Sequence, residues 1–157
     1  MPIIFSLADF EVLCHATESR DKVIEAVKNL IPVELHSLAN IKEDKLEGHY
    51  HNPITKINII LEGNTEVGLT LSLIFNGMIA EEKEDLLRRL SDYIDDAGIL
   101  YLRLNKQKAY DKKIALKYDT GDVIRLKVKL LKKKSVSKRE VLEAYSSLIS
   151  GINLSNC

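Results

Sequence analysis

Cationic side chains occupy every second position in one short segment towards the C-terminal end of the chain. Arg125, Lys127 and Lys129 alternate there with aliphatic residues. Because neighbouring side chains of a strand point to opposite faces, this spacing predicts a strand over 123–131 with one basic face and one packed face. Cations on a solvated sheet face are placed to contact phosphate groups, although lysines on outer strands also serve to discourage edge pairing.

The segment 99–105 has the same two-faced pattern. Its outward positions include Tyr101 and Arg103, and leucines fill the positions between them. An aromatic ring beside cations offers a stacking surface for nucleobases. Lys106 and Gln107 follow at the end of this segment, where we expect them to join Arg103 in holding a phosphate, with the guanidinium as a bidentate donor.

A turn-rich loop over 48–53 carries side chains that can contact unpaired bases. His49 and Tyr50 can stack on bases, and Asn52 can form hydrogen bonds with them. An Asn-Pro pair also begins a turn in the ordinary way, so a purely structural interpretation of this loop stays open.

The histidines raise the question of a metal site. His49 and His51 are separated by one residue, and His15 or His36 is available as a third ligand. No cysteine or acidic cluster at ligand spacing accompanies them, and single histidines usually have structural roles. The sequence therefore predicts no metal, no cofactor and no catalysis, with a metal-dependent hydrolase that uses His49 and His51 as the catalytic alternative.

The formal charge of zero is divided unequally along the chain. Residues 1–100 hold 9 Lys/Arg and 18 Asp/Glu, whereas residues 101–157 hold 14 and 5. No acid interrupts residues 125–139, so this basic block is expected to face solvent or an anionic partner. The alternative to nucleic-acid binding is therefore a protein-interaction or self-assembly module, including a homodimer in which basic and acidic parts meet.

Length and composition suit a single globular domain over 1–157. The chain is 45% hydrophobic and 29% charged. No apolar run reaches the roughly 20 residues that span a bilayer, and the first residues lack the pattern of a signal peptide. The two cysteines, Cys14 and Cys157, form no disulfide framework. We therefore expect a cytoplasmic protein with no membrane partner.

Strand and helix patterns alternate along the chain, and together they predict an α+β fold. We expect two layers, a mixed β-sheet and helices on one of its faces. The stretch 67–75 alternates like a strand but equally fits a short buried helix. Strands are expected over 2–14, 33–41, 54–61, 99–104 and 123–131. Helices are expected from a cap at Thr17 or Ser19 to Pro32, over 81–96, and from a capping box of Ser137 and Glu140 to Gly151.

Three short motifs, met in the same order along the chain, resemble those of a known family. They are His15-Ala16-Thr17-Glu18, Gly48-His49-Tyr50-His51-Asn52-Pro53 and Leu100-Tyr101-Leu102-Arg103-Leu104-Asn105-Lys106-Gln107. Over about residues 10–131 the chain resembles the archaeal family of RNA-binding proteins and predicted exosome subunits. The fold of that family resembles the large-subunit ribosomal protein that binds five-S RNA.

The resemblance implies a non-catalytic RNA-binding protein that serves RNA-processing or ribosome-related machinery. It implies RNA as a partner, the exosome or ribosomal proteins as further partners, and a helix over 66–77. The candidate RNA-binding residues are Arg103, Lys106, Gln107, Arg125, Lys127, Lys129, His49, Tyr50 and Asn52.

Overall fold

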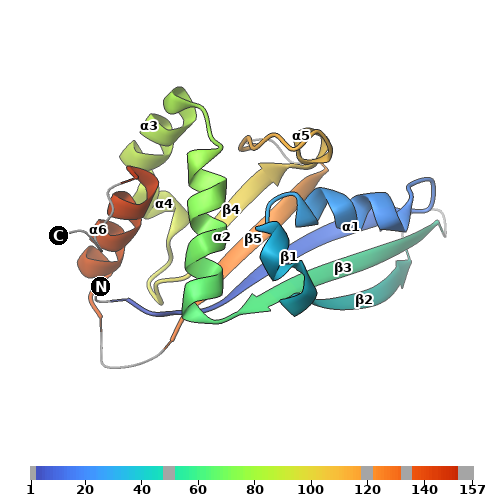
Figure 1. The fold of residues 1–157 in the computed structure, drawn as a ribbon, viewed down its shortest axis with the longest axis horizontal. Helices are drawn as coiled ribbons and strands as arrows, with labels where there is room; N and C mark the ends of the chain where they lie inside the picture. Colours follow the sequence, from blue (N-terminus) through green and yellow to red (C-terminus); the bar gives the residue numbers. More distant parts are fainter. Residues whose placement is uncertain (1–2, 48–51, 118–121, 132–135, 152–157) are drawn as a thin grey trace.

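A computed structural model describes residues 3–47, 52–117, 122–131 and 136–151. Within these ranges the chain forms a five-stranded sheet with helices packed on one face (Figure 1), so the predicted α+β fold is confirmed. The strands are β1 (Phe5–His15), β2 (Asn40–Glu47), β3 (Pro53–Glu62), β4 (Leu100–Asn105) and β5 (Val123–Leu130). The helices are α1 (Arg20–Lys28), η1 (Val33–Leu38, a 3-10 helix), α2 (Asn64–Asn76), α3 (Ala80–Arg88), α4 (Leu90–Tyr93), α5 (Lys106–Tyr110) and α6 (Lys138–Ile149).

The sheet has the strand order β2-β3-β1-β5-β4, and each of these neighbouring pairs is antiparallel. The prediction of a mixed sheet is therefore wrong. The chain crosses over through α1 after β1, and β2 then runs parallel to β1. However, β3 then lies between those two strands and runs opposite to both, so the two parallel strands never pair.

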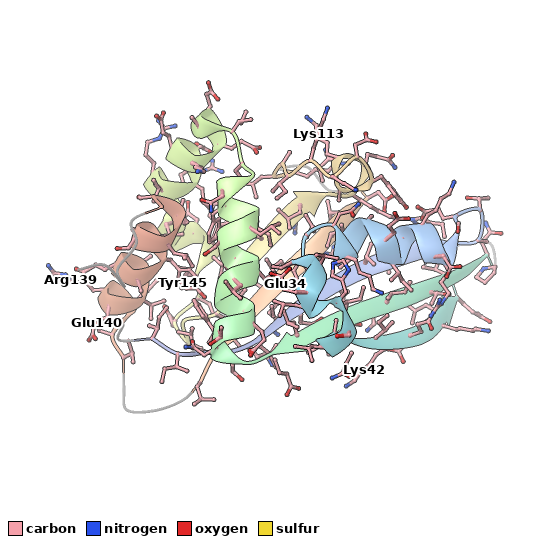
Figure 2. The ribbon with its side chains drawn as sticks, viewed as in Figure 1. Glu34, Lys42, Lys113, Arg139, Glu140 and Tyr145 are labelled. Carbon is pink, nitrogen blue, oxygen red and sulfur yellow. The ribbon has the colours of Figure 1, made fainter. Side chains whose placement is uncertain are left out.

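The helix-covered face of the sheet forms the core. Phe10 of β1, Ile59 of β3 and Leu126 of β5 point to this face and are buried. Tyr145 of α6 points towards α2 (Figure 2), and its ring centroid lies 6.0 Å from that of Phe5. Removal of this apolar surface from water supplies the main driving force for folding. Of the described residues, no helix covers the opposite face of the sheet (Figure 1), and we call it the open face.

Helix starts follow the capping residues in the sequence. Ser19 begins α1, with its hydroxyl oxygen 3.4 Å from the backbone N of Lys22, so it is the cap among the two candidates. Ser137 caps α6 as predicted, and its Oγ accepts from the backbone N–H of Glu140 (3.2 Å) and donates to the Glu140 carboxylate (3.1 Å). The ambiguous stretch 67–75 is part of α2, as the family resemblance implied.

The predicted helix over 81–96 is wrong in its length. Arg89, with φ −113° and ψ 20°, separates α3 from α4. Beyond α4 the chain is extended at Ile94, which forms an isolated bridge with Leu100. Asp95 Oδ1 accepts from the backbone N–H groups of Ala97 and Ile99, each at 2.9 Å, and so stabilises a tight turn where the helix was expected to continue.

The predicted strand over 33–41 is wrong over its first part. Residues 33–38 form η1, and the following strand β2 begins only at Asn40. His36 Nε2 lies 2.8 Å from the carbonyl oxygens of both Lys28 and Ile31. The ring therefore ties η1 to the C-terminal end of α1 and to the residues that follow it, a contact that an extended segment leading directly away from the helix would not make. Among the described residues, no helix is long and apolar enough to cross a membrane.

Candidate nucleic-acid interface

The open face of the sheet gathers the cations that strand alternation predicted. Arg103 of β4 pairs in register with Arg125 of β5, and Tyr101 pairs with Lys127. Side chains of these four residues line a cavity of about 450 Å³, named here the open-face cavity. Lys129 is exposed two residues further along β5. The structure thus brings together four of the nine predicted binding residues.

Acidic side chains of β1 lie directly beside these cations. Asp9 is paired in register with Lys127, and Glu11 with Arg125. Arg125 Nη1 is 3.6 Å from Glu11 Oε2, while Asp9 Oδ1 accepts a hydrogen bond of 2.9 Å from Asn58. The acids partly neutralise the β5 cations and repel phosphate from β1. Among the strands of the open face, positive side chains therefore lie along β4 and β5, and negative ones along β1.

Tyr101 was missed as a site residue, although the alternation of β4 had already placed it on this face. It is 44% exposed, and its ring centroid lies 5.8 Å from Lys127 Nζ. Its hydroxyl donates to Asp95 Oδ2 at 3.1 Å. The backbone N–H of Ile99, with smaller contributions that include Tyr101, holds the pKa of Asp95 below its usual range against the effect of burial. The ring is therefore an anchored platform beside the cations.

Lys106 does not face RNA, and its prediction as a phosphate ligand is wrong. The side chain is fully buried at 0% exposure. Its ammonium lies 2.8 Å from the Leu13 carbonyl oxygen, 2.8 Å from Glu18 Oε2 and 3.0 Å from Asp122 Oδ2. An ammonium group has three N–H donors, and these three neighbours use all of them. We call Lys106, Glu18 and Asp122 the Lys106 cluster.

The Lys106 cluster joins three separate parts of the chain. Glu18 also accepts from the backbone N–H of His15 at 3.0 Å, which closes the turn between β1 and α1. Asp122 lies at the start of β5, and Lys106 begins α5. The cap of α1 is Ser19, and Glu18, the residue before it, balances a buried charge.

Three side chains at this place hold their potential ligand atoms close enough together to suggest a metal site. They belong to His15, Glu18 and Asp122, and the ligand atoms lie within 4.8 Å of one another. The ammonium of Lys106 already lies between the two carboxylates and supplies the positive charge that they require. These three side chains are therefore not suited to hold a metal ion beside the ammonium of Lys106. His49 and His51, the residues of the hydrolase alternative, lie outside the described residues.

Hydrogen bonding should make the Lys106 cluster sensitive to acid. Burial raises the pKa of Glu18, but hydrogen bonds from Lys106 and from the His15 N–H outweigh that effect and hold the pKa below its ordinary value of 4.5. Such a carboxylate stabilises the fold above its unfolded pKa and loses this contribution as pH falls through the folded pKa. Wild type should therefore melt at a higher temperature than Glu18→Gln at pH 6.

The difference between the two melting temperatures should shrink steadily below about pH 4.5, the unfolded value. Thermal melts followed by circular dichroism from pH 6 to pH 3 measure it. A difference that stays constant over this range would contradict the assignment.

The remaining predicted residues lie apart from the open-face cavity. Gln107 is exposed on α5, a helix that packs against α1 beyond the end of β4. Asn52 is exposed immediately before β3, which β1 separates from the basic strands. His49 and Tyr50 lie outside the described residues. The site that the structure assembles therefore consists of Tyr101, Arg103, Arg125, Lys127 and Lys129.

Comparison with known proteins places this geometry in a family. A family model described as RNA binding matches residues 8–130. RNA-binding protein PAB1135 from Pyrococcus abyssi is 29% identical over 136 residues, covering 82% of this chain and 88% of that protein.

Solved structures agree over nearly the whole chain. Protein AF2318 from Archaeoglobus fulgidus is 30% identical with a TM-score of 0.74, covering 92% of this chain and 99% of that one. The DUF54 protein Mth689 from Methanothermobacter thermautotrophicus is 26% identical with the same TM-score, covering 93% and 98%. The span that the family model matches contains β2 to β5 in full, β1 from Ala8 onward, and every residue that lines the open-face cavity. The chain belongs to this archaeal RNA-binding family.

Proposed function

We propose that the chain is a non-catalytic RNA-binding protein that holds RNA on the open face of its sheet. The observation that carries the proposal is the convergence of Arg103, Arg125 and Lys127 around the platform of Tyr101, with Lys129 exposed two residues further along β5. No carboxylate among the described residues pairs with the side chain of Arg103 or Lys129, so both are available to phosphate. The printed name of the Pyrococcus abyssi relative supports RNA as the ligand.

The two kinds of side chain have separate roles. The guanidinium and ammonium groups bind the phosphate backbone and release counterions, which supplies affinity without reading sequence. The ring of Tyr101 stacks on an exposed base. Asp9 and Glu11 repel phosphate from β1, so the backbone follows β4 and β5 rather than crossing the whole sheet.

We place this activity in RNA processing or ribosome-related machinery of the cytoplasm, with the exosome or ribosomal proteins as protein partners. The support is the resemblance carried by the three sequence motifs. Co-purification of the tagged protein under conditions that preserve RNA, with and without ribonuclease, tests the assignment. Recovery of exosome or ribosomal proteins supports it, and their absence from both samples contradicts it.

Salt dependence tests RNA binding by the open face. Four phosphate contacts should give a slope of about −3 when the logarithm of affinity for single-stranded RNA is plotted against that of salt concentration. Tyr101→Leu should lower affinity about tenfold with the slope unchanged, because stacking releases no counterions. Filter binding at several salt concentrations measures both quantities. Failure to bind RNA even at low salt would refute the proposed function.

A further inference from the structure

A second cavity adjoins the open face at the outer side of β4, and we name it the edge cavity. It has a volume of about 710 Å³ and is lined by Asp92 and Tyr93 of α4 together with Tyr101, Arg103 and Lys117. Tyr101 and Arg103 also line the open-face cavity, so the two cavities lie side by side along β4. The volume lies within the range of roughly 300–1,000 Å³ that small-molecule pockets occupy.

Both aromatic rings of the edge cavity are held by hydrogen bonds. The hydroxyl of Tyr93 accepts from Arg89 Nη2 at 3.1 Å, and that of Tyr101 donates to Asp95 Oδ2 at 3.1 Å. A ring that is already fixed loses little conformational entropy when a ligand packs on it. Every nucleobase has a π-face that can stack on such a ring.

The charged groups around the rings match the two ends of a nucleotide. Arg103 and Lys117 supply positive charge for a phosphate, while Asp85 and Arg89, which also line the cavity, form an ion pair of 3.8 Å with each other. Asp92 supplies hydrogen-bond acceptors, and among the described residues no ion pair or side-chain hydrogen bond engages it. A carboxylate accepts N–H groups from base edges, and guanine presents two adjacent N–H donors on its Watson–Crick edge. That edge is accessible only when the base is unpaired.

We propose that the edge cavity binds an unpaired nucleobase of single-stranded RNA, with guanine preferred. The base stacks on Tyr93 and Tyr101 and donates to Asp92, while its phosphate contacts Arg103. The strand then continues onto the open face. This inference rests on the proposed function, because the backbone contacts on β4 and β5 deliver the base to the cavity.

Fluorescence-anisotropy titration at one salt concentration tests the proposal with three RNAs. These are a single strand containing guanine, the same strand with adenine at those positions, and the blunt duplex of the guanine strand. Wild type should bind the guanine strand about tenfold more tightly than either of the others. Tyr93→Leu should lower affinity for the guanine strand about tenfold and leave duplex affinity unchanged.

Asp92→Asn keeps the shape of the side chain and should remove the preference for guanine over adenine. The control is Asp96→Asn, which removes an exposed carboxylate outside the cavity and should leave all three affinities unchanged. Circular dichroism confirms that each variant is folded. Because Asp92 is exposed, its variant decides the question even where Tyr93→Leu disturbs the fold.

The possible outcomes separate the two claims. Equal affinity for single strand and duplex, or a guanine preference that survives Asp92→Asn, would overturn the base-binding proposal while leaving RNA binding by the open face intact. Absence of binding to all three RNAs would overturn the proposed function itself.

Discussion

Lys106→Met is expected to lower the free energy of unfolding by about 3 kcal/mol, the lower end of the range for breaking a buried ion pair. Methionine keeps the unbranched stem of lysine but removes the ammonium. Glu18, Asp122 and the carbonyl of Leu13 then lose their shared partner. We choose the lower end because the Glu18 and Asp122 side chains are 20% and 33% exposed, so water can solvate them in part. Urea unfolding at pH 7 measures the change.

Two further variants identify the cause of that loss. Lys108→Met alters an exposed lysine of the same helix and should change stability by less than about 0.5 kcal/mol. Adding Glu18→Gln to Lys106→Met should recover part of the stability, because one of the two unpaired charges is then removed. If Lys106→Met were as stable as Lys108→Met, the Lys106 cluster would have no role in holding the fold.

RNA affinity separates the structural role of Lys106 from the phosphate contact that the sequence suggested. Well below its melting temperature, Lys106→Met should bind RNA as wild type does, since the ammonium is fully buried. A loss of affinity with a flatter salt slope would instead restore Lys106 to the RNA-binding surface.

Strand alternation is a local property, and it predicted the open face well. Side chains alternate between the two faces along β4 and along β5. This local geometry alone places Arg103, Arg125 and Lys127 on the open face of the sheet. The antiparallel register then brings Arg103 opposite Arg125, which neither segment reveals alone. The same alternation places Tyr101 on this face, although Tyr101 was not among the predicted binding residues.

The predictions for Lys106 and for the helix over 81–96 were wrong because contacts that the apolar periodicity does not reveal decide both. Nothing near Lys106 in the sequence reveals Glu18, which lies 88 residues away. Similarly, helical spacing of apolar residues persists beyond Arg88, yet the bridge between Ile94 and Leu100 and the Asp95 turn end the helical path. Here a turn and a short bridge override the apolar periodicity where the chain turns back into the sheet.

Arg125→Ala combined with Lys127→Ala is expected to lower affinity for single-stranded RNA about tenfold or more in low salt. It should also flatten the salt slope by about 1.4, because each lost phosphate contact contributes about 0.7. Neither side chain belongs to the core, so the melting temperature should change little. Titrations at several salt concentrations, alongside thermal melts, measure these effects.

The matched control is Lys138→Ala combined with Arg139→Ala, which removes the same charge from the start of α6. These residues lie in the helical layer, and Arg139 projects outward there (Figure 2). If binding depended only on net charge or on the whole basic segment 125–139, the two double variants would weaken it equally. A loss of RNA affinity in the β5 double variant alone would mean that the phosphates follow a defined path along the open sheet face. Equal losses would mean that this face is an ordinary solvated surface, and that the RNA contacts lie elsewhere on the chain.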